Sequence, residues 1–167
     1  MRLLLLEKRE FLKFTANTFR ENGFYRKGTN FYRECNDDII VVFSFFKSSY
    51  GSYFYAEYGL AFKTINKHLP YPKYNELDIN FGRIMMSFGK AIKYENITEE
   101  ELNDFSSTIK NYVDRILSIV EKGKKEIVRQ CIDTSPPVVE YVLKETPSFL
   151  GLSADLFKDK GIAVIDF

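Results

Sequence analysis

Residues 38–47 read as a β-strand that is apolar on both of its faces. Side chains alternate across a strand, so one face carries Ile39, Val41, Phe43 and Phe45 and the other carries Ile40, Val42 and Phe46. A strand buried on both sides belongs in the middle of a sheet whose two faces are covered. We therefore expect a central strand here, and we expect helices to cover the sheet.

Period-two patterns place this strand among hairpins. Further strands are expected at 25–27, 30–35 and 53–62, separated by links of two to five residues, and another begins near 77. Links this short join antiparallel strands, because a parallel crossover needs a dozen residues or more. The pattern predicts five to six strands, mostly antiparallel.

Two helices are predicted beside the sheet. The first is indicated by residues at helical spacing that form one stripe, Leu12, Thr15, Ala16 and Phe19. Gly23 is expected to end this helix. The second runs over 99–122, and Thr98 with Glu101 forms a capping box at its start. Weaker patterns predict a helical segment over 138–143, a helix over 154–160 capped by Ser153, and a strand over 162–167.

These elements predict one α+β domain over residues 1–167. We expect a mostly antiparallel sheet of five to six strands packed against an N-terminal helix and a long capped helix. A smaller C-terminal helical segment completes it.

Charge and composition exclude several classes of protein. The 24 Lys and Arg against 23 Asp and Glu give a net charge of +1, which disfavours a nucleic-acid-binding domain. No stretch approaches the roughly 18 apolar residues of a membrane span. Cys35 and Cys131 are too few and too far apart for a disulfide framework. We expect reduced thiols and a cytoplasmic protein.

The residues offer no recognisable catalytic constellation. The chain has one His, His68, so neither a Ser or Cys nucleophile with its base nor a zinc site is indicated. Glycine-rich phosphate loops are absent from the sequence, and we expect no cofactor and no metal. A pair of catalytic carboxylates stays open.

Two segments carry opposite charge. Residues 1–35 hold eight Lys or Arg against four Glu, whereas residues 95–104 hold five acids and no base. Each is either a solvated surface, helped in the second case by the helix dipole, or an interaction surface.

The hairpin after residue 46 gathers side chains that can bind a partner or an anion. Lys47, Ser48 and Tyr50 supply a cation, a hydroxyl and a phenol within four residues. Ordinary turn packing is the alternative. The candidate binding residues are Lys47, Ser48, Tyr50, Arg83, Arg26 and Arg33.

Two motifs resemble an uncharacterised bacterial family of domains of unknown function. Residues 23–33, GFYRKGTNFYR, resemble that family's GF(basic)(basic)GxxFYR hairpin, and residues 45–51, FFKSSYG, resemble its FxKSxYG hairpin. The resemblance covers roughly residues 8–120. A Trp pair that members often carry is missing here, because the chain has no Trp. The family implies an α+β fold in a bacterial cytoplasm and supplies no activity.

We therefore expect a non-catalytic domain that binds a protein partner, as an inhibitor or immunity-type protein. The alternative is a small-molecule or anion-binding protein, or an unrecognised enzyme, with a site near Lys47, Tyr50 and Arg83. Nucleic acid and membrane are not expected partners.

Overall fold

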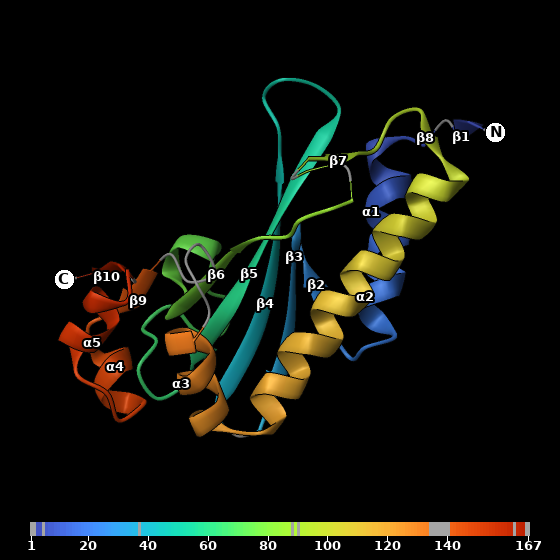
Figure 1. Ribbon diagram of the computed structural model, residues 1–167. Coiled ribbons are helices and arrows are strands. Elements are labelled where there is room, and N and C mark those ends of the chain that lie inside the picture. Colours follow the sequence, from blue (N-terminus) through green and yellow to red (C-terminus); the bar gives the residue numbers. More distant parts are fainter. Residues whose placement is uncertain are drawn as a thin grey trace.

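The computed structural model describes residues 3–4, 6–36, 38–87, 89, 91–133, 141–161 and 163–165. Figure 1 shows a long sheet with its main helices on one side. The elements along the chain are β1 (Leu3–Leu4), α1 (Lys8–Arg20), β2 (Tyr25–Lys27), β3 (Asn30–Cys35), β4 (Ile39–Lys47), β5 (Tyr53–Phe62), η1 (Tyr74–Glu76), β6 (Ile79–Arg83), β7 (Ile92–Lys93), β8 (Ile97–Thr98), α2 (Glu99–Glu121), α3 (Lys124–Asp133), β9 (Tyr141–Leu143), α4 (Glu145–Phe149), α5 (Ala154–Asp159) and β10 (Ala163–Ile165).

The sheet has the order β10-β9-β6-β5-β4-β3-β2, and β7 also pairs with β5. Strands β2 to β6 are joined antiparallel, whereas β9 and β10 are parallel. This confirms the α+β fold and the central place of β4. The helical interpretation of 138–143 is wrong for 141–143, which form β9 because they pair with β6 and β10; the rest of that segment lies outside the described residues.

Helices α1 and α2 cover one face of the sheet, as predicted (Figure 1). The capping box is present: Glu101 N donates to Thr98 Oγ1 at 3.1 Å, and Thr98 N donates to Glu101 Oε2 at 2.7 Å. Helix α1 ends before Gly23, whose φ is +78°. These caps fix where each helix begins or ends.

The opposite face of the sheet is covered by a loop. Residues 64–77, which we call the roof, contain η1 and place Leu69, Tyr74 and Leu77 on the apolar cluster of β3, β4 and β5. Tyr32 Oη donates to the backbone oxygen of Pro72 in the roof at 3.2 Å. The expectation that helices cover both faces was therefore wrong for this face, because apolar side chains of the roof bury Ile40 and Val42 without a helix.

The roof does not bury the whole face. Phe46, near the end of β4, is 41% exposed, although the alternation placed it with Ile40 and Val42. Exposed side chains therefore lie on this face of the sheet, which no helix covers, near the end of β4.

Candidate functional site

A row of polar side chains crosses the helix-free face of the sheet. The register pairs Lys27 with Asn30, Asn30 with Ser44, Ser44 with Glu57, and Glu57 with Arg83. Their strand neighbours Phe43, Phe45, Ala56 and Tyr58 belong to the helix-side core, so these five side chains point the other way. We call them the polar row.

Glu57 and Arg83 form an ion pair at the end of the polar row. Arg83 Nε donates to Glu57 Oε1 at 2.7 Å, and the Glu57 side chain is only 8% exposed. The Arg83 guanidinium lies 4.5 Å from the centre of the Tyr55 ring and its side chain is 43% exposed. The arginine is therefore held in one orientation while part of it faces solvent.

Two buried polar atoms on this face have no hydrogen-bond partner in the described part of the protein. They are Ser44 Oγ, directly opposite Glu57, and Asn80 Nδ2, on the next strand. Ordered water is the usual partner of such groups.

Aromatic side chains lie beside the polar row. Phe46 pairs with Tyr55 in the register, and its ring lies 5.6 Å from that of Tyr74 in the roof. Tyr53, two residues before Tyr55 on β5, is 38% exposed. We call Phe46, Tyr53, Tyr55, Tyr74 and Arg83 the aromatic-arginine surface.

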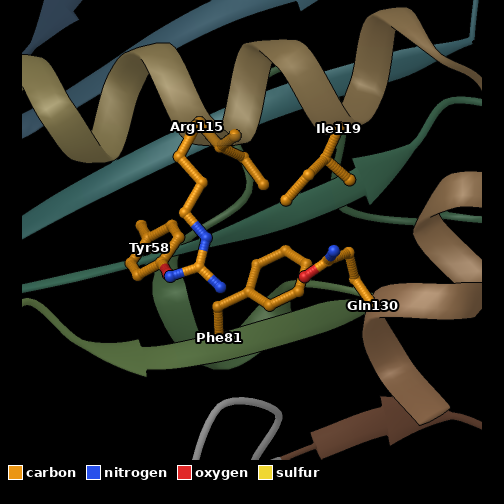
Figure 2. Close-up of a pocket in the computed structure, with 6 residues that line it drawn as sticks. Tyr58, Phe81, Arg115, Ile119 and Gln130 are labelled. Atoms are coloured by element: carbon orange, nitrogen blue, oxygen red, sulfur yellow. The ribbon is translucent and has the colours of Figure 1, made fainter. Parts of the chain in front are cut away.

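The helix side of the sheet has a hollow too small for a ligand. Figure 2 shows Arg115 reaching from α2 across Tyr58 and Phe81, with Gln130 beside Phe81. The volume left between them is about 10 Å³, about enough for one water molecule. Burial raises the pKa of Tyr58 to about 12, so its hydroxyl stays protonated at neutral pH. This region is part of the core.

The predicted hairpin residues do not form one site with Arg83. Lys47 pairs with Phe54, whose ring lies in the helix-side core, so Lys47 and Arg83 project from opposite faces of the sheet. Ser48 Oγ accepts a hydrogen bond from Tyr50 N at 3.1 Å inside the turn. Tyr50 itself is 94% exposed.

The two other predicted arginines bind the chain's own backbone. Arg26 Nε donates to Gly28 O at 2.7 Å. Arg33 Nη1 donates to Asn22 O at 2.6 Å, next to the end of α1. Sequence reasoning missed Ser44, Glu57 and Phe46; a serine within an otherwise apolar strand is the signal that could have drawn attention to the polar row.

The described residues contain no cluster that could hold a metal ion, and their two thiols are buried. No three His, Cys, Asp or Glu side chains of that part of the chain lie close enough to hold a metal ion. Cys35 and Cys131 are free and buried, and burial raises the pKa of both thiols, that of Cys131 to about 12. A raised pKa favours the protonated thiol over the thiolate, which is unfavourable for a nucleophile.

Within the ranges that the structure describes, every helix is too short or too polar to cross a membrane.

Comparison with known proteins gives a family without an assigned activity. The model of a domain of unknown function, DUF4304, matches residues 15–128. That range includes the C-terminal part of α1, the strands β2 to β6 and α2, and therefore the polar row and the aromatic-arginine surface. No curated protein and no solved structure matches the chain.

Proposed function

Since the chain belongs to the DUF4304 family of domains of unknown function, we propose its role from its surface: it is a non-catalytic domain that binds a protein partner. The role is that of an inhibitor or immunity-type protein. The observation that carries the proposal is the aromatic-arginine surface on the helix-free face of the sheet.

The composition of this surface is typical of the energetic centre of a protein interface. Aromatic residues and arginine dominate such centres, because they bury large areas and lose little side-chain entropy. Phe46 and Tyr53 keep about two fifths of their area exposed, although both belong to strands with well-buried cores. A partner that covers these rings gains apolar burial without ordering a loop.

The neighbours of Arg83 hold its guanidinium in an orientation suited to binding a partner. The buried Glu57 carboxylate and the Tyr55 ring hold the guanidinium in place. A partner carboxylate or carbonyl that meets the exposed part of Arg83 therefore loses little entropy in forming the contact. The +4 segment 1–35 and the −5 segment 95–104 add electrostatic complementarity that favours one orientation of docking.

A bacterial cytoplasm is the setting we propose. It is supported by Cys35 and Cys131, which are unpaired and buried and fit a reducing compartment.

The first test is native mass spectrometry of the chain, gently purified from its own host. An added protein-sized mass that saturates supports the proposal. An added mass of small-molecule size contradicts it and favours the alternative, an anion or ligand site.

Variants then locate the interface. Phe46→Ser and Arg83→Lys should each reduce the captured partner, because the first removes an exposed ring and the second keeps the charge but loses the planar stacked group. Lys110→Ala is the matched control, since Lys110 is exposed on α2 and pairs with Asp114 of the same helix. Retention of the partner by both test variants, with loss in Tyr50→Ser, would move the interface to the hairpin tip.

A further inference from the structure

A small apolar hollow lies where β7, β8 and the start of α2 meet. Its floor is made of three buried side chains, Ile92, Ile97 and Phe105. Met86 and Ala91 line it from the segment between β6 and β7, and Tyr53 lines it from β5. Ile92, Ile97 and Phe105 belong to the helix-side core, so the hollow lies on the helix side of the sheet and shares Tyr53 with the aromatic-arginine surface.

The hollow is smaller than a typical ligand site. Its volume is about 230 Å³, below the range of roughly 300–1,000 Å³ that holds drug-sized ligands. An aliphatic chain of a few carbons fits such a space and gains by burial against the floor.

Acidic groups stand at the mouth of the hollow. Glu101 and Asp104 line it, and three further glutamates, Glu95, Glu99 and Glu100, are exposed in the same acidic segment. Lys93, a cation that also lines the hollow, donates to Asn96 O at 3.1 Å, and its charge helps to lower the pKa of Glu101. Two carboxylates and one ammonium therefore line the hollow, which leaves an excess of negative charge. The surroundings therefore favour a positive charge at the mouth.

The geometry of the two carboxylates distinguishes between cations. Glu101 Oε2 already accepts from Thr98 N at 2.7 Å, and Asp104 Oδ1 accepts from Ser87 Oγ at 2.8 Å. Each of these oxygens keeps a second lone pair, but the hydrogen bond already made restricts the directions from which the fork of a guanidinium can reach both oxygens of one carboxylate. An ammonium group, which is a compact charge with rotatable donors, fits this mouth better.

We propose that this hollow receives a lysine side chain of the protein partner, with the aliphatic stem on Ile92, Ile97 and Phe105 and the ammonium between Glu101 and Asp104. The inference rests on the proposed function for the identity of the partner. The chemistry of the hollow itself can be tested without that partner.

The probe is n-butylammonium, which has the shape and charge of a lysine side chain. Titration into the isotopically labelled 167-residue chain should give saturable shifts in the NMR signals of Ile92 and Ile97 with millimolar affinity, as expected for a ligand of a few heavy atoms. 1-Butanol, pentanoate and n-propylguanidinium are the neutral, anionic and arginine-like comparisons, and each should bind more weakly. Equal or tighter binding of any of them overturns the assignment to lysine, and so does the lack of saturable shifts with n-butylammonium.

Three variants connect the shifts to the hollow. Ala91→Phe should fill it and abolish the shifts, and Asp104→Asn should weaken n-butylammonium about two- to five-fold. Asp114→Asn, on the same helix and exposed, is the matched control and should leave the affinity unchanged.

The partner then separates the two proposals. If n-butylammonium binds as expected but no saturable protein partner is found, the proposed function is wrong, whereas the alkylammonium-binding chemistry of the hollow is supported. If a partner is captured through Phe46 yet survives Ala91→Phe, the lysine proposal fails and the function stands.

Discussion

Replacing Asp78 with Asn tests whether a buried carboxylate weakens this fold at neutral pH. Asp78 directly follows the roof and is fully buried. Its Oδ2 accepts from Phe62 N at 2.5 Å and from Asn66 Nδ2 at 3.2 Å, while Oδ1 has no partner in the part of the chain described. Burial raises the pKa of Asp78 from 3.8 to about 6, although the hydrogen bonds from Phe62 and Asn66 act in the opposite direction.

The sign of the effect follows from the raised pKa. The folded state holds the Asp78 proton more tightly than the unfolded state, so ionisation opposes folding. The contribution to stability is complete below about pH 4 and is lost as the pH rises through about 6. The gap between 3.8 and about 6 corresponds to about 3 kcal/mol of unfolding free energy.

An asparagine side chain at this position keeps the shape and the acceptor oxygen but cannot ionise. We therefore expect the Asp78→Asn variant to match the wild type near pH 4 and to be more stable by about 3 kcal/mol near pH 7. Urea unfolding followed by far-ultraviolet circular dichroism at several pH values measures this difference. Asp155→Asn, an exposed position, controls for a general change in charge.

Two results would refute the reasoning. One is an Asp78→Asn variant that is less stable than the wild type at neutral pH. The other is a difference in stability that stays constant across the acid range, because the effect must follow the titration of one carboxyl group.

Three further predictions concern the sheet and its helix. Gly59→Ala should lower the unfolding free energy by about 3 kcal/mol or more in urea titrations, because a Cβ there would lie 2.1 Å from the backbone oxygen of Ile79; a loss under about 0.5 kcal/mol would contradict the close approach of the two strands. Thr98→Ala should cost about 1 kcal/mol through loss of the α2 cap, and a neutral result in the same assay would show that the cap adds nothing. Arg83→Ala should lower the unfolding free energy by about 1–3 kcal/mol, because it leaves the buried Glu57 carboxylate unpaired. The double variant Arg83→Ala with Glu57→Gln should recover part of that loss. No recovery would mean that the two side chains are not coupled.

Local patterns in the sequence were enough for most of the fold. The ranges 25–27, 30–35 and 53–62 agree with β2, β3 and β5, because alternation and turn residues act between near neighbours. The capping box at Thr98 and the stop at Gly23 were likewise readable, since each involves only a few consecutive residues. Ser153 was correctly predicted to cap α5, where its Oγ accepts from Leu156 N.

The elements missed are those that depend on partners distant in sequence. The roof covers Ile40 and Val42 although no periodicity marks residues 64–77 as packed. Residues 141–143 form a strand because β6 and β10 supply its hydrogen bonds, which outweigh a local helical pattern.

The candidate site shows the same division. The sequence by itself predicted a doubly apolar strand over residues 38–47, which contains β4, and an acidic run that opens the long helix. Only the tertiary structure decided that Glu57 pairs with Arg83, that Lys47 and Arg83 project from opposite faces of the sheet, and that the acidic run borders a hollow. The reason is physical. Alternation within a strand decides which residues of that strand share a face. Which residues of neighbouring strands meet depends on the strand register and on its shift between β5 and β6, and packing of the whole core sets both.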